Sequence, residues 1–181
     1  MNRIDFNKDG TYDVKPIIIH PERKKKLNDN LLMFFTGFTR LSSDMQNANQ
    51  SGYKTHEDLL LEMYALVDKA EAILEDNHSE LDEFGRLLDL TWKMKKTSAK
   101  TVTTDAIDSF YDRGIRAGAL GGKLLGAGGG GFLLFYVQPD KRENVMNAMK
   151  DLLYVPFKFV DGGSQVIHYT AESYVPKEEL I

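Results

Sequence analysis

Hydrophobic and polar residues alternate near the amino terminus and recur at helical spacing farther along, a pattern that predicts strands followed by helices. Residues 4–6 and 12–14 alternate on either side of the turn sequence Asn-Lys-Asp-Gly at 7–10, which is typical of a β-hairpin. Apolar runs at 17–19 and 31–35 predict two further strands. The chain is therefore expected to begin in a sheet.

Helix-start signals follow this first group of strands. Thr55 and Ser79 each open a capping-box sequence, with an acidic residue three positions later and apolar residues at helical spacing beyond it. Thr103 or Thr104 is expected to cap a third helix, and Pro139 to open a fourth. The middle of the chain is thus predicted to be mainly helical.

Three more strands are predicted late in the chain, at 132–137, 155–160 and 165–169. No internal repeat and no linker divides the sequence. Strands followed by helices, with a late strand-helix-strand segment, favour an α+β fold. We expect a two-layer sandwich in which helices cover one face of a mainly antiparallel sheet.

Composition limits the classes of function. Of the 181 residues, 42% are hydrophobic and 28% are charged, which is typical of a globular domain. The chain has no cysteine, so a disulfide frame, a thiolate nucleophile and a cysteine zinc site are excluded. The net charge of -4 argues against nucleic-acid binding. Apolar runs are too short to span a bilayer and the first ten residues are polar, so we expect a cytoplasmic protein with no membrane partner.

Metal sites and hydrolase triads are not indicated by the sequence. The stretch from Asp5 to Gly10 fits the first half of a calcium loop, but Pro16 stands where the loop needs a bidentate glutamate, so a hairpin turn is favoured. The histidines lack the spacing of metal ligands: His20, His56, His78 and His168. We therefore predict no metal ligand and no catalytic residue from these patterns.

The segment 126–131, with the sequence GAGGGG, lies between two apolar runs. It satisfies the dinucleotide pattern GxGxxG, but a strand rather than a helix is predicted after it. A P-loop is excluded because Leu124 follows Lys123 where a serine or threonine is required. Successive backbone N–H groups without side chains can bind phosphate, yet glycines also permit tight packing or a bulge. Both explanations stay open at this point.

Charge is unevenly distributed along the chain. Acidic residues predominate between Glu57 and Asp89, whereas basic residues predominate between Trp92 and Lys123, immediately before the glycines. This pattern is compatible with two solvated helix faces of opposite charge. A site for an anionic ligand is the more specific alternative.

Residues 118–132, GALGGKLLGAGGGGF, resemble the third, carboxy-terminal motif of the GHMP kinases, the superfamily of galactokinase, homoserine kinase, mevalonate kinase and phosphomevalonate kinase. Segments 34–40, 92–96 and 107–108 most resemble the D-glycero-D-manno-heptose 7-phosphate kinases, which phosphorylate the anomeric hydroxyl of a phosphorylated heptose. The similarity extends over essentially the whole chain. It implies the ferredoxin-like fold of the GHMP kinase C-terminal domain, with ATP and magnesium as cofactors of the complete enzyme.

The resemblance also implies a set of site residues. Backbone approach to the nucleotide is expected at Gly126, Ala127, Gly128, Gly129, Gly130 and Gly131. The pocket for the sugar phosphate is expected to include Thr36, Gly37, Thr39, Arg40, Lys95, Lys96 and Lys123. In this interpretation Arg40 holds a phosphate bidentately and the lysines add positive charge, whereas Trp92 belongs to the core.

In that family, the ATP-binding loop and the catalytic aspartate precede the segment that matches Asn2 to Phe6. We therefore expect residues 1–30 to be a hairpin and strand that continue a missing amino-terminal half, and residues 31–181 to be the C-terminal domain. Such a chain is expected to be inactive alone. Its partners would be a sugar phosphate and either the missing half or a second copy bound through an exposed face. The alternative is a non-catalytic sugar-phosphate or partner-binding module descended from such a kinase.

Overall fold

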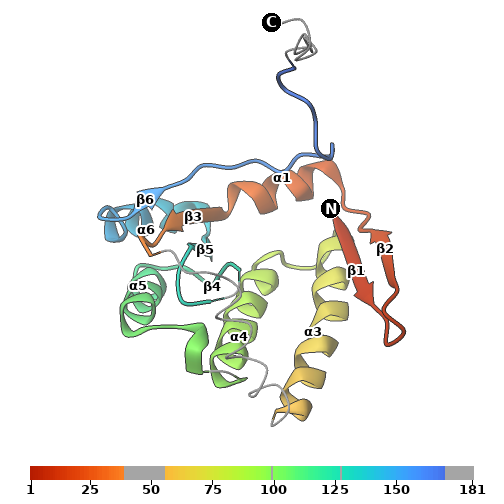
Figure 1. Ribbon diagram of the computed structural model, residues 1–181. Helices are drawn as coiled ribbons and strands as arrows, with labels where there is room; N and C mark the ends of the chain where they lie inside the picture. Colours follow the sequence, from red (N-terminus) through yellow and green to blue (C-terminus); the bar gives the residue numbers. More distant parts are fainter. Residues whose placement is uncertain (39–55, 99, 127, 170–181) are drawn as a thin grey trace, which may run out of the picture.

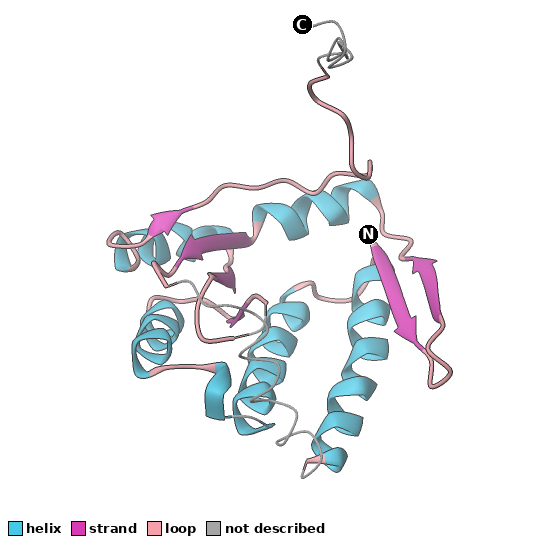
Figure 2. Ribbon diagram, viewed as in Figure 1, coloured by secondary structure: helices cyan, strands magenta, loops and turns pink. Residues whose placement is uncertain are grey.

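The computed structural model describes residues 1–38, 56–98, 100–126 and 128–169 (Figure 1). In these ranges the chain forms two antiparallel sheets and five helices (Figure 2). The strands are β1 (Asn2–Phe6), β2 (Tyr12–Pro16), β3 (Leu31–Phe35), β4 (Gly121–Leu124), β5 (Phe132–Tyr136) and β6 (Leu153–Tyr154). The helices are α1 (Pro21–Asp29), α3 (Glu57–Glu75), α4 (Asp82–Ser98), α5 (Asp105–Arg116) and α6 (Arg142–Ala148), with short 3-10 turns η1 (Lys100–Val102) and η2 (Pro139–Lys141).

The larger sheet has the strand order β4-β5-β3-β6, and each neighbouring pair is antiparallel. Leu32 lies opposite Phe135 and Phe34 lies opposite Leu133, so these four side chains share one face. All four are fully buried. They form one core with side chains of α4, α5 and α6 and of the residue that follows α6: Trp92, Ile107, Tyr111, Val145 and Met149. The predicted α+β fold with an antiparallel sheet is confirmed.

The other face of the sheet is covered less completely. Met33, Phe35 and Leu134 occupy the alternate positions and are only half-buried. A second core cluster lies where β3 begins and β5 ends, and joins this end of the sheet to α1, α3 and the start of α4: Leu27, Leu31, Leu74, Leu81 and Tyr136. The helices therefore bury one face fully and the other face mainly at one end.

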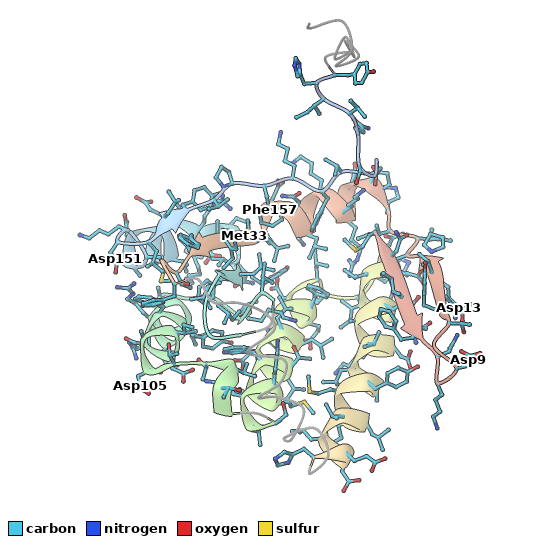
Figure 3. The ribbon with its side chains drawn as sticks, in the orientation of Figure 1. Asp9, Asp13, Met33, Asp105, Asp151 and Phe157 are labelled. Carbon is cyan, nitrogen blue, oxygen red and sulfur yellow. The ribbon has the colours of Figure 1, made fainter. Side chains whose placement is uncertain are left out.

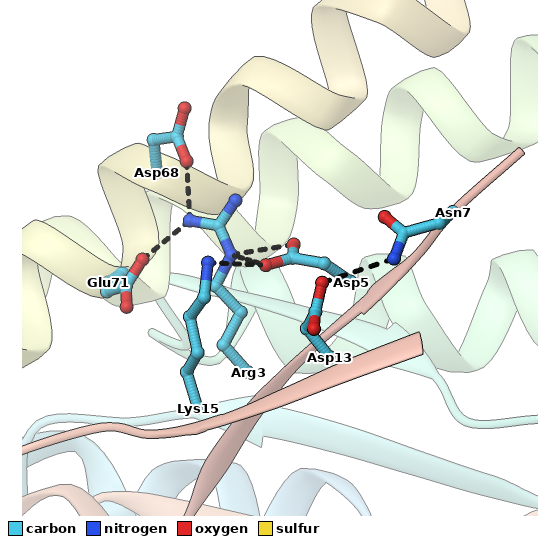
Figure 4. A network of polar contacts seen from close by, with 7 residues as sticks. All are labelled: Arg3, Asp5, Asn7, Asp13, Lys15, Asp68 and Glu71. Carbon is cyan, nitrogen blue, oxygen red and sulfur yellow. Dashed lines mark hydrogen bonds and ion pairs between the residues drawn. The ribbon is translucent and has the colours of Figure 1, made fainter. Parts of the chain in front are cut away.

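The predicted hairpin is confirmed as a separate two-stranded sheet beside α3 (Figure 1). On its inner side, Arg3 donates to the carboxylates of Asp68 and Glu71 on α3, at 2.6 Å each, and also to Asp5 (Figure 4). Its outer side carries four apolar residues that are 51% to 82% exposed: Ile4, Phe6, Tyr12 and Val14. Ion pairs therefore attach one face of the hairpin to α3, and the apolar side chains of the other face are exposed to solvent.

Three predicted strands are not strands in the structure. Residues 17–19 form an extended connection whose Ile17 and Ile19 pack against the second core cluster. Residues 155–160 are extended, but the side chain of Asn28, rather than a strand, pairs with the backbone of Phe157 and Phe159. Residues 165–169 are exposed and pair with no strand in the described ranges. An apolar alternation becomes a strand only where a partner edge is available.

The helix-start signals were right in part. The Thr104 side chain accepts a hydrogen bond from the backbone N–H of Ile107, so it caps α5 as predicted. Pro139 opens the 3-10 turn that leads into α6. Ser79 does not cap α4, because its hydroxyl bonds to carbonyl oxygens of the preceding turn. Thr55 lies outside the described residues.

Candidate functional site

The glycine segment connects β4 to β5, and each of its glycines has a geometric reason to be glycine. Four have positive φ, a conformation that residues with a Cβ rarely adopt: Gly126, Gly128, Gly129 and Gly131. The fifth, Gly130, has no such φ, but a Cβ there would lie 2.6 Å from the carbonyl oxygen of Phe38. Ala127 lies outside the described residues. The segment is thus a close-packed backbone loop, hereafter the glycine loop (residues 126–131).

Two N–H groups of the glycine loop bind protein carbonyls. Gly129 donates to Val102 and Gly131 donates to Phe38, each at 2.9 Å. A Cβ on Gly128 would also lie 2.9 Å from the Val102 backbone. Packing therefore accounts for part of the glycine requirement, and phosphate binding by the loop stays a prediction. The carbonyls of Val102 and Phe38 were missed from the sequence because any residue type can supply a backbone carbonyl.

Thr36 fixes the end of β3 to the glycine loop. Its backbone N–H and its side-chain hydroxyl both donate to the Gly131 carbonyl oxygen, at 2.9 Å each, and the residue is buried. Gly37, with φ of 79°, turns the chain immediately afterwards. Thr36 and Gly37 thus position the loop from the neighbouring strand. Thr39 and Arg40, the other two residues expected here, lie outside the described residues.

Lys95 on α4 and Lys123 on β4 form a pair of half-buried cations beside the glycine loop. The Lys95 ammonium donates to the Gly126 carbonyl oxygen at 3.1 Å. Burial lowers the pKa of both lysines, and the charge of Lys123 lowers the pKa of Lys95 further. Neither lysine has a carboxylate within ion-pairing distance among the described residues. Within the described ranges, these two positive charges are therefore not neutralised by a carboxylate.

Lys96 has different neighbours. Its ammonium lies 2.9 Å from the carboxylate of Asp108 and over the rings of Trp92 and Tyr111. Trp92 is 1% exposed and belongs to the core, as expected. The three predicted lysines are thus divided, with Lys95 and Lys123 at the glycine loop and Lys96 in a salt bridge between α4 and α5.

Close contact between α4 and β4 brings the lysine pair together. A Cβ on Gly121 would lie 2.0 Å from the carbonyl oxygen of Gly85, and a Cβ on Gly85 would lie 2.6 Å from the ring of Tyr136. Only glycines permit this approach of helix to strand. The sequence signal for this contact is an isolated glycine, Gly85, in a helical pattern.

The site suits an anion better than a metal ion. The lysine pair and the exposed Gly126 offer positive charge next to an open backbone. In the part of the chain that the structure describes, no group of three metal-ligating side chains occurs. Phosphate groups fit this chemistry, whereas magnesium lacks a set of protein ligands in the same ranges.

None of the helices in the described ranges combines the length and apolarity needed to cross a bilayer.

Residues 69–155 match the family model described as GHMP kinases C terminal. With its antiparallel sheet, its helical layer and its glycine loop, the chain contains the carboxy-terminal domain of a GHMP kinase. It is 31% identical over 153 residues to the D-glycero-alpha-D-manno-heptose 7-phosphate kinase of Campylobacter jejuni, a match that covers 80% of this chain. The chain is thus related to a heptose phosphate kinase.

Solved structures show the same fold. A D-glycero-D-manno-heptose 1-phosphate kinase from Bacteroides thetaiotaomicron superposes with a TM-score of 0.60 at 22% identity, over 90% of this chain and 43% of that one. Mevalonate kinase of L. major superposes with a TM-score of 0.61 at 20% identity, over 80% of this chain and 43% of that one. The chain spans 44% of the Campylobacter protein, so it corresponds to less than half of each of these relatives.

Proposed function

We propose that this chain is the C-terminal domain of an ATP-dependent sugar kinase of the heptose 7-phosphate type, and that Lys95 and Lys123 bind the phosphate that the sugar already carries. The observation that carries the proposal is the placement of these two half-buried lysines, with the Lys95 ammonium donating to the Gly126 carbonyl oxygen at 3.1 Å. Burying two like charges without a counterion is unfavourable unless an anion completes the site. A sugar phosphate dianion matches the charge of two ammonium groups.

The glycine loop has a separate role in this proposal. Gly126 is exposed and carries no side chain, so the phosphates of ATP could approach the loop backbone there without steric hindrance. ATP supplies the transferred phosphoryl group. Thr36 holds the loop in place by its two bonds to Gly131, and the lysines keep the acceptor in a fixed position. Positioning and charge are the main contributions that a protein makes to phosphoryl transfer.

Calorimetric titration with D-glycero-D-manno-heptose 7-phosphate tests the proposal. We expect Lys123→Met to weaken binding by roughly tenfold or more, because one charge-assisted contact is lost. Lys93→Met is the control, since Lys93 lies on α4 like Lys95, but is exposed and pairs with Asp89. Binding that is equal in the wild type and in Lys123→Met would contradict the proposal.

A second protein component is part of this proposal. The relatives contain as much chain again as this one spans, and the hairpin presents an exposed apolar side formed by Ile4, Phe6, Tyr12 and Val14. We propose that the amino-terminal half of the kinase covers this side, and that the chain is inactive without it. A mixture of the two halves that binds the sugar phosphate and still fails to phosphorylate it would favour a non-catalytic binding module.

A further inference from the structure

A cavity of about 870 Å³ lies between α1, the start of α6 and the extended segment 154–159. Lys123 is on β4 and Tyr154, which lines the cavity, is on β6, so these two residues lie on opposite edge strands of the sheet, three strand spacings or about 14 Å apart. No residue of the glycine loop or of the lysine pair lines the cavity. It is therefore a different site from the proposed sugar-phosphate site.

The walls of this cavity are held by specific hydrogen bonds. The Asn28 side chain donates to the Phe157 carbonyl at 3.2 Å and accepts from the Phe159 N–H at 2.7 Å, which fixes the segment alongside α1. Figure 3 labels Phe157 on this segment and Met33 on the neighbouring β3, whose carbonyl accepts from the Val155 N–H at 2.8 Å. The cavity is thus preformed and does not depend on a ligand to open it.

Positive charge predominates in the lining. The cationic side chains are Lys24, Lys25, Arg142 and Lys158, and the acidic one is Asp29. Lys24 pairs with Asp161 and Lys25 pairs with Asp29. Among the described residues, no carboxylate pairs with Arg142 or Lys158. Two cations in this lining are therefore available to an external anion.

Arg142 is held at the cavity by neutral acceptors. Its guanidinium donates to the Asp29 carbonyl oxygen at 2.8 Å and to the Tyr154 hydroxyl at 3.1 Å. Because the Tyr154 oxygen accepts from Arg142, the hydroxyl proton points to another acceptor, and the described residues supply none. An arginine and a tyrosine hydroxyl thus offer adjacent donors that an anion can use.

The remaining lining is flat and apolar. Phe157 and Phe159 lie edge to face with their ring centroids 5.9 Å apart, and three prolines complete the surface: Pro21, Pro139 and Pro156. We propose that this cavity binds an organic anion with an aromatic body, of the size and chemistry of a nucleoside monophosphate. The anionic group meets Arg142 and Tyr154, and the ring packs on Phe157 and the prolines.

Amide chemical-shift titration of the full chain with AMP tests this inference, with adenosine and inorganic phosphate as parallel probes. We expect AMP to shift the amides of residues 21–31 and 154–159 and to bind at least roughly tenfold more tightly than either fragment, since it uses both parts of the cavity. Shifts confined to the glycine loop would overturn the inference. That result would leave the proposed sugar-phosphate site unaffected, so the two proposals fail separately.

Charge variants provide the second arm of the test. Arg142→Gln removes the positioned guanidinium, and Lys158→Glu reverses an exposed charge that holds no part of the fold. We expect each to weaken AMP binding by roughly tenfold. Lys8→Glu makes the same charge change at the tip of the hairpin and is expected to leave binding unchanged. AMP affinity that is equal in Lys158→Glu and Lys8→Glu, or no detectable binding at millimolar AMP, would overturn the inference.

Discussion

Replacing Lys123 by methionine should make this protein more stable while it loses affinity for the sugar phosphate. Lys123 is half-buried on β4, its charge lowers the pKa of Lys95, and it has no carboxylate partner among the described residues. Methionine keeps most of the apolar stem and removes the charge. We expect the free energy of unfolding to rise by about 1 kcal/mol, because water at the edge of the site screens both the burial cost and the repulsion.

The difference in the free energy of unfolding between Lys123→Met and the wild type should depend on pH with a definite sign. Burial lowers the pKa of Lys123 in the folded chain below its ordinary value of 10.5. Between the lowered pKa and 10.5 the unfolded chain binds more protons, so the stability of the wild type rises with pH in that window. The advantage of Lys123→Met should therefore be largest at neutral pH and should disappear above pH 10.5. Urea unfolding of both proteins across this range measures it.

Lys93→Met is the control for this experiment. Lys93 lies on α4 like Lys95, but it is exposed and its ammonium is 2.7 Å from the Asp89 carboxylate. Its replacement should lower stability slightly or leave it unchanged. A Lys123→Met protein that is less stable than the wild type at neutral pH would refute the argument that this charge is buried without compensation.

Three further predictions concern the loop and the hairpin. Gly130→Ala should lower the free energy of unfolding by about 1 to 3 kcal/mol, because the new Cβ would lie 2.6 Å from the Phe38 carbonyl oxygen. Thermal unfolding measures this loss. Gly163→Ala is the control and should have little effect, because nothing lies within 4 Å of a Cβ at that position. Phe6→Ser, on a residue that is 82% exposed, should reduce association with the amino-terminal half or with a second copy, and unchanged sedimentation in both mixtures would count against this. Arg3→Met should release the hairpin from α3, since the bonds to Asp68 and Glu71 are lost, and faster amide exchange in β1 and β2 would reveal it.

The sequence predicted those elements whose signals are local. The hairpin follows from residues 7–10 and the flanking alternation, and the cap on α5 follows from Thr104. Residues 17–19 form an apolar run like that of β3, and residues 165–169 are also rich in apolar residues, yet neither segment is a strand in the structure. Strand formation depends on a partner edge, which a single sequence does not reveal.

The candidate site could be predicted only to the level of residue types. Lys95 and Lys96 are adjacent on a helix and point about 100° apart, so only one of them could face the glycine loop. Lys95, rather than Lys96, lies at the glycine loop because Lys96 forms an ion pair with Asp108, a residue of α5. The position of Asp108 relative to α4 cannot be read from the sequence. The glycines are recognisable in the sequence, and a nucleotide-binding role for them stays a prediction, but their contacts with Val102 and Phe38 come from distant segments of the chain.

Amide chemical-shift mapping with D-glycero-D-manno-heptose 7-phosphate tests the central claim most directly. We expect saturable shifts at Lys95, Lys123 and Gly126, with no change at residues 154–159, and loss of these shifts in the Lys95→Met/Lys123→Met double variant. The double variant must first give the dispersed spectrum of a folded protein. Shifts that persist unchanged in that folded variant, or no shifts at the lysine pair in the wild type, would contradict the claim that these two lysines bind the sugar phosphate.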